Sequence, residues 1–221
     1  MVPVSTARTT ALRRTAVRAT LAPSVHNTQP WRLHLRADRL DIWADRRRQL
    51  AVLDPTSRQL TLSVGCALFN ARVSAAGDGL GLTVLRHPDP KQADLLASLR
   101  PDDRPADAAL AALDPVLELR QTNRRPFADE DVPETLLNLL ELAAVAEDAS
   151  LVAVRDPDQR LAVATLSRHA DDIENLNPAY RAELRAWTTD DPGRRDGVPA
   201  LAVPRVDGSA RDEVPMRDFD T

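Results

Sequence analysis

The sequence predicts an α+β fold in which helices surround a small antiparallel sheet. Residues 31–44 alternate apolar and polar side chains on both sides of a short turn, which is typical of a β-hairpin with one buried face. Residues 54–76 repeat small and aliphatic side chains at the helical period. This second pattern predicts a central helix that packs closely on both sides.

The composition is that of an ordinary globular protein, with 43% hydrophobic residues, 28% charged residues and a formal net charge of -4 over 221 residues. This balance favours neither a nucleic-acid partner nor an anionic membrane surface. Cys66 is the only cysteine, and the four histidines show no metal-ligand spacing, so we expect no disulfide and no metal site. No apolar run approaches the roughly 18 residues of a membrane span, and the expected location is the cytoplasm.

The first elements follow from periodicity and from helix breakers. Residues 5–21 have the helical period, and Pro23 ends this helix. Two strands at 31–35 and 40–44 form the hairpin, and each presents one apolar face.

The central helix has clear start and stop signals. Asp54 is its predicted N-cap, Pro55 lies in its first turn, and the helix runs to Gly77. The glycines of residues 77–81 do not fit a nucleotide-binding pattern and precede a strand instead of following one, so they predict a turn before a strand at 82–85.

The second half of the chain reads as mostly helical. The expected elements are helices at 91–99 and 106–119, a helix opening at 132–134 with Leu136, Leu137, Leu140 and Ala144 on its buried face, a strand at 151–154, and a helix starting at Asp156-Pro157. From Thr188 periodicity disappears, which predicts an irregular tail that is disordered or held only by a ligand or partner.

Residues 22–31, Ala-Pro-Ser-Val-His-Asn-Thr-Gln-Pro-Trp, form a shaped loop between the first helix and the hairpin. Its two prolines fix φ and make both ends of the loop rigid. Ser24, Asn27 and Gln29 supply donors and acceptors suited to the edge of a planar heterocycle. The alternative is a helix end that runs into a strand, with Trp31 in the core.

Arg120, Thr122 and Arg124 form a second candidate site. Side chains two residues apart on an extended segment can converge on one side, so two guanidinium groups and a hydroxyl could bind one phosphate. The alternative is a solvated basic turn.

The residues Ala-Pro-Ser-x-x-Asn-x-Gln-Pro-Trp resemble the signature loop of the nitroreductase-like flavoproteins, and in particular the Acg-type branch known from actinobacteria. The segment from Arg120 to Pro133 resembles the phosphate-binding opening of that family, with Thr122 in place of serine. The resemblance implies FMN as cofactor, with the loop against its ring system. The cofactor-binding residues that it implies are Pro23, Ser24, His26, Asn27, Gln29, Arg120, Thr122 and Arg124.

Typical members of this family are homodimers whose flavin lies across the subunit interface. The resemblance therefore implies a degenerate internal duplication of the fused-dimer type, with a first half at 1–119, an incomplete second half at 120–187 and a tail or lid segment at 188–221. The family's later elements are missing, so we expect a C-terminal truncation, or a homodimer in which a second subunit supplies those elements.

The resemblance implies hydride transfer from NADH or NADPH through FMN to a nitroaromatic or quinone-type acceptor. The flavin performs this chemistry, so no general acid or base is assigned. His26 is a candidate because it can titrate near neutrality, and the alternative is a histidine that only hydrogen-bonds its neighbours. Two alternatives are a flavin-sequestering protein without turnover and an inactive fragment that needs a partner chain.

Overall fold

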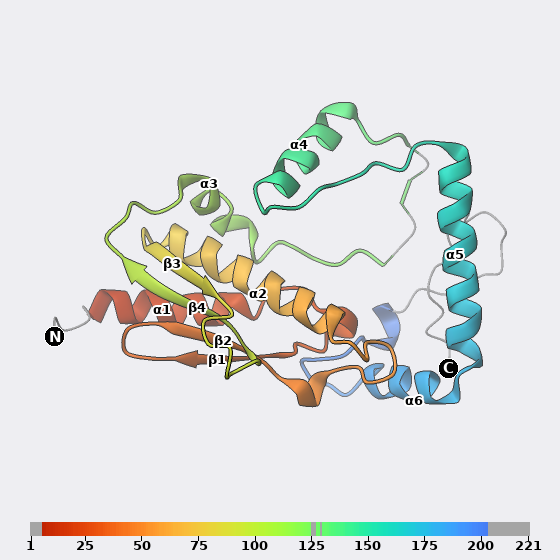
Figure 1. Cartoon of the computed structure of the whole chain (residues 1–221), viewed down its shortest axis with the longest axis horizontal. Coiled ribbons are helices and arrows are strands. Elements are labelled where there is room, and N and C mark those ends of the chain that lie inside the picture. Colours follow the sequence, from red (N-terminus) through yellow and green to blue (C-terminus); the bar gives the residue numbers. More distant parts are fainter. Residues whose placement is uncertain (1–5, 125–126, 129, 203–221) are drawn as a thin grey trace. The chain divides into compact units, whose positions relative to one another are not determined.

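The computed structural model describes residues 6–124, 127–128 and 130–202 (Figure 1). The chain divides into two compact units: the first comprises Met1–Thr122 and Arg185–Ala200, and the second Asn123–Leu184 and Leu201–Thr221. Within the described residues there are six α-helices and one four-stranded antiparallel sheet, which confirms the α+β class. No helix in this described part is long and apolar enough to cross a lipid bilayer.

The first unit holds all four strands. Its regular elements are α1 (Thr6–Ala19), β1 (Trp31–Leu35), β2 (Leu40–Ala44), α2 (Arg58–Gly77), β3 (Gly81–Arg86), β4 (Leu95–Asp102) and the short α3 (Ala108–Ala111). Short 3-10 turns occupy Val25–Asn27, Arg46–Arg48 and Asp114–Val116. The strand order is β1-β2-β4-β3, and every neighbouring pair is antiparallel.

The core of the first unit lies between one face of the sheet and the helices α1 and α2, which run alongside the strands in Figure 1. Ile42 pairs with Leu33 on β1 and with Ala97 on β4, and all three side chains belong to or pack against this core. Leu12 of α1 and Leu60 of α2 are buried against the same cluster. The hairpin at 31–35 and 40–44 is therefore confirmed, and so is the central position of α2.

The helix expected at 91–99 is wrong, because this stretch enters the sheet as β4. Leu95, Ala97 and Leu99 are buried, and this spacing of two residues is the period of a strand. Alanine and leucine favour helices, but pairing with β2 and β3 outweighs that local preference.

The helix expected at 106–119 is also shorter than predicted. Only the four residues of α3 and the turn Asp114–Val116 are helical. Pro115 has no backbone N–H to donate to the carbonyl of Ala111, so the hydrogen-bond ladder of an α-helix is interrupted at this point.

Helix α2 ends at Gly77 as predicted but starts at Arg58, four residues after the expected N-cap. The carboxylate of Asp54 still caps it, because Oδ2 accepts the backbone N–H of Leu60 at 2.8 Å. The end of the helix packs closely: a Cβ at Gly77 would lie 2.6 Å from Cβ of Asp114.

The second unit contains α4 (Glu134–Val145), α5 (Pro157–Leu176) and the start of α6 (Pro178–Trp187). Asp156 caps α5 as predicted, since its Oδ1 accepts the N–H of Gln159 at 3.0 Å. The strand expected at 151–154 is wrong, because these residues form no strand. The expected buried face of α4 (Leu136, Leu137, Leu140, Ala144) is also wrong, because no residue of α4 is buried.

Candidate functional site

The loop at residues 22–31, here called the signature loop, connects α1 to β1. Ala22 and Trp31 are buried in the core cluster, so both ends of the loop are fixed. Trp31 is thus a core residue, which agrees with the alternative interpretation of this stretch as a helix end that runs into a strand. Between these ends the chain forms the 3-10 turn Val25–Asn27.

Ser24 organises the inside of the signature loop. Its Oγ accepts the backbone N–H of Gln29 at 2.9 Å, and its carbonyl oxygen accepts the N–H of Asn27 at 2.9 Å. The N–H of Val25 donates to Oγ of Ser63 on α2 at 3.2 Å, which attaches the loop to the central helix.

Three residues of this loop have left-handed backbone conformations. His26, Asn27 and Gln29 have φ values of 46°, 53° and 49°. Such conformations cost about 1–3 kcal/mol each for residues other than glycine, and they persist only where the surroundings hold them. The neighbours of the loop must therefore supply the stabilisation.

One such neighbour is the segment 188–200, here called the strap. The N–H of Gly197 donates to the carbonyl of Asn27 at 3.1 Å, and Nδ2 of Asn27 donates back to the carbonyl of Gly197 at 2.9 Å. Nε2 of Gln29 donates to the carbonyl of Arg195 at 2.7 Å. The side-chain amides of two predicted flavin-binding residues thus contact this strap. These contacts lie within the first unit, whereas the sequence predicted a tail from Thr188 that is disordered or held only by a ligand or partner. Residues 203–221 of that tail lie outside the described residues.

An ion cluster joins the strap to the loop a second time. Nη1 of Arg48 donates to the carbonyl of Thr28 at 2.9 Å and to Oδ2 of Asp196 at 2.6 Å. Nε of Arg194 donates to Oδ1 of Asp196 at 2.8 Å. Burial acts to raise the pKa of Asp196, but the hydrogen bonds from Arg194 and Arg48 outweigh it and hold that pKa below its usual range.

Arg120 lies next to the start of the signature loop. Its Nη2 donates to the carbonyl of Leu21 at 3.3 Å, and its Nη1 lies 3.5 Å from Oγ1 of Thr122. Burial raises the pKa of the Cys66 thiol on α2, and the positive charge of Arg120 partly opposes this. Two members of the predicted phosphate cluster thus lie in the first unit with the loop, whereas Arg124 belongs to the second unit. Arg125 and Pro126, which follow this cluster, lie outside the described residues.

The sequence interpretation missed the residues that hold the segment leading to Arg120. Nη2 of Arg14 lies 2.8 Å from Oδ2 of Asp114, and Nη1 of Arg18 lies 2.5 Å from Oε1 of Glu118. These ion pairs attach the chain just before Arg120 to helix α1. The sequence does contain a pattern that could have indicated these ion pairs: the two arginines are four residues apart, and so are the two acidic residues.

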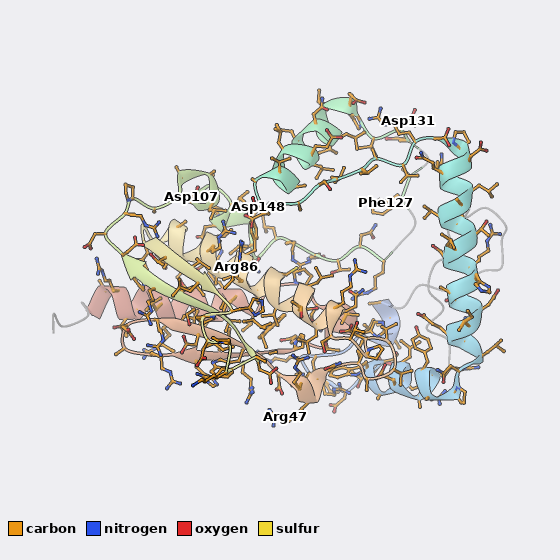
Figure 2. The ribbon with its side chains drawn as sticks, in the orientation of Figure 1. Arg47, Arg86, Asp107, Phe127, Asp131 and Asp148 are labelled. Atoms are coloured by element: carbon orange, nitrogen blue, oxygen red, sulfur yellow. The ribbon has the colours of Figure 1, made fainter. Side chains whose placement is uncertain are left out.

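A cavity of about 650 Å³ lies in another part of the first unit. It is lined by residues of α2 and β3 and of the segment before α3, including Arg86 and Asp107, which Figure 2 labels. None of the predicted cofactor-binding residues lines it, so it is not the site that the two motifs predict.

Comparison with protein-family models gave no match. Three relatives from Mycobacterium tuberculosis (strain ATCC 25618 / H37Rv) are similar to this chain. "Putative NAD(P)H nitroreductase Rv3131" is 34% identical over 206 residues, which make up 91% of this chain and 57% of the relative. "Putative NAD(P)H nitroreductase acg" is 32% identical over 185 residues, 81% of this chain and 55% of the relative. "Uncharacterized protein Rv3127" is 29% identical over 184 residues, 80% of this chain and 53% of the relative.

The chain therefore spans a little more than half the length of the relatives that it matches. The two named nitroreductases match most of this chain, and they agree with the resemblance carried by the signature loop and the Arg120 segment. Over most of its length this chain is thus similar to the nitroreductase-like, Acg-type proteins.

Proposed function

We propose that this chain binds FMN and acts as a nitroreductase-like oxidoreductase, transferring hydride from NADH or NADPH to a nitroaromatic or quinone-type acceptor. The observation that supports this most directly is the contact between Arg120 and Leu21. It brings a guanidinium group, suited to a phosphate, to the first residues of a loop suited to a flavin ring. Arg120 and Leu21 are far apart in the sequence and belong to the same compact unit.

The donors of this site fit FMN in their chemistry. Arg120 and Thr122 offer a guanidinium and a hydroxyl to the phosphate dianion. The backbone around Ser24 and His26 is held in one conformation by hydrogen bonds, so it can orient a flat ring. The hydroxyl of Thr28 is buried in the loop and has no hydrogen-bond partner among the described residues.

Bound FMN supplies the redox chemistry, because its ring accepts a hydride and passes it on. The residues of this chain would bind the phosphate and orient the ring. Pro23 shapes the loop at the side of Arg120, and Ser24 fixes its turn. His26 lies half-buried in the loop and is the one titratable side chain of residues 22–31.

The test is the visible absorption spectrum of the purified full chain, followed by titration of the flavin-free protein with FMN. Arg120→Gln should weaken FMN binding by on the order of 10- to 100-fold, because one charged hydrogen-bonding group is lost. Arg100→Gln is the matched control, since Arg100 is an exposed residue of β4 outside both motifs. A colourless protein that does not bind added FMN would refute the proposal.

A flavin-sequestering function is the second candidate, and the strap favours it. The strap already contacts the side chains of Asn27 and Gln29, so part of the signature loop is covered by the chain itself. The two functions differ in turnover. If the yellow protein consumes NADH or NADPH when a nitroaromatic or quinone is added, it is a reductase, whereas colour without consumption supports sequestration.

A further inference from the structure

We infer that Asp196 is a positioning residue for the signature loop: by pairing with Arg48 and Arg194 it fastens the strap across Asn27 and Gln29 and holds the loop in its left-handed conformation. This inference rests on the proposed function in so far as the loop binds FMN. Asp196 itself is not assigned any contact with the flavin.

The left-handed conformation of the signature loop needs support from neighbouring residues. Three non-glycine residues with positive φ lie within four positions, and a free loop would relax from that conformation. Hydrogen bonds inside the loop, from Ser24, fix its turn but do not reach the carbonyl of Asn27. That carbonyl is bound by the N–H of Gly197 on the strap.

The strap supports the loop through hydrogen bonds to Asn27 and Gln29. Asn27 exchanges two hydrogen bonds with Gly197, and Gln29 adds a third to Arg195. Gly197 has a φ of 82°, and a Cβ there would lie 2.8 Å from the carbonyl oxygen of Trp187. The close packing of Gly197 against the end of α6, together with its positive φ, therefore favours glycine at this position.

The strap is itself held in place by the residues on both sides of Gly197. Val198 is buried, and its N–H donates to the carbonyl of Trp187 at 2.8 Å while its carbonyl accepts the N–H of Thr189 at 3.0 Å. Asp196 lies on the other side of Gly197. Its carboxylate is the strap's ionic contact with Arg48, a residue that also binds the carbonyl of Thr28 in the loop.

These contacts assign a role to the two amides of the loop. At least one N–H of Asn27 and one of Gln29 are directed to strap carbonyls. Their side chains therefore hold the loop, and contacts with the ring fall to the backbone and to Ser24 and His26. A loop held in this way is preorganised, which strengthens ligand binding without any new contact.

The experiment compares Asp196→Asn with Asp190→Asn in the full chain without FMN. Asp190 lies in the same strap, where its Oδ1 accepts the N–H of Ala200, so it is a matched control. Hydrogen exchange should become about tenfold faster at the backbone amides of Asn27, Thr28 and Gln29 in Asp196→Asn. Exchange in β2, β4 and α2 should stay as in the unmodified protein, because a general loss of stability is not the mechanism.

A second variant, Gly197→Ala, displaces the strap by collision while leaving all charges in place. It should accelerate exchange in the same three amides. Both variants should bind FMN about tenfold more weakly than the unmodified chain, the equivalent of one charge-assisted hydrogen bond. Unchanged exchange at these amides in Asp196→Asn would overturn the inference, and so would tighter FMN binding, which would mean that the strap blocks the loop.

The two proposals fail separately. If the unmodified chain does not bind FMN but Asp196→Asn accelerates exchange in the loop, the proposed function is wrong and the positioning role of Asp196 is supported. If the unmodified chain binds FMN and Asp196→Asn changes neither exchange nor affinity, the proposed function is supported and the positioning role is wrong.

Discussion

Helices α2 and α5 have the same length and similar starts, yet they differ in how much they bury. Each has 20 residues, and each has an Asp-Pro pair at or just before its start whose carboxylate accepts a backbone N–H of the first turn. Helix α2 buries eleven residues, whereas α5 buries only Ala164. Local capping signals are therefore enough to start a helix of this length, but they do not decide what it packs against. The sheet of the first unit provides that surface for α2.

The largest expected effect compares a core residue of the first unit with an exposed residue of α5. Ile42 is 0% exposed and Leu166 is 70% exposed. Ile42→Ala should lower the free energy of unfolding by about 2–5 kcal/mol, because it leaves a cavity between β2 and α2. Leu166→Ala should change it by less than about 0.5 kcal/mol. Urea unfolding followed by circular dichroism measures both values, and a large loss for Leu166→Ala would show that α5 is covered in solution.

Two glycines on α2 allow a packed position and an open position to be compared within one helix. At Gly77 a Cβ would collide with the side chain of Asp114, which ion pairs with Arg14 and Arg18 hold in place. Gly77→Ala should therefore destabilise the protein by about 1–3 kcal/mol. A Cβ at Gly65 meets nothing within 4 Å. Gly65→Ala should raise the free energy of unfolding by about 0.5–1 kcal/mol, because alanine favours a helix. A destabilising Gly65→Ala would reveal a partner on this face of α2.

The smallest effect is a pH dependence that belongs to the first unit. The side chain of Asp41 is 3% exposed, accepts a hydrogen bond from Oγ of Ser98 at 2.6 Å and pairs with Arg39. Burial acts to raise the pKa of Asp41, but these two partners outweigh it and leave that pKa below its usual value. The stabilisation is therefore present above the unfolded pKa of about 3.9 and is lost as the pH falls through the lower folded pKa.

Asp41→Asn removes this charge while keeping the shape of the side chain. Compared at pH 7 and again below pH about 3, the urea midpoint of the unmodified chain should fall more than that of the variant. An equal fall in both proteins would mean that Asp41 does not contribute to the acid sensitivity of the first unit.

The elements that the sequence predicted well are those with short-range signals. Alternation in residues 31–44 predicted the hairpin, and Asp156-Pro157 predicted the start of α5. The segment of β4 carries alanine and leucine, which favour helices, and only its pairing with β2 and β3 makes it a strand. Because that pairing is not local, periodicity over a short window could not predict it.

In the candidate site, too, the residues with local sequence signals were identified and those that depend on distant contacts were not. Residues 22–31 and the Arg120 segment were identified from their composition and spacing. Residues 188–221 were expected as a tail or lid segment, but the pairing of Asn27 with Gly197 was not predicted, because these two residues are 170 positions apart and Asp196-Gly197 by itself indicates only a turn. Arg48 was missed for the same reason. An arginine in a run of three has no local feature that distinguishes a partner of a distant carboxylate from a solvated surface charge.

Helix α6 crosses the boundary between the two units without interruption, from Pro178 in the second unit to Trp187 in the first. Its last residue offers the carbonyl to which Val198 is bonded, and Val198 follows Gly197 directly. In topological terms residues 123–184 are inserted into the chain of the first unit, and α6 carries the chain from the second unit back into the first. The boundary between the units therefore falls inside a helix, so the last turn of α6 belongs to the same unit as the signature loop.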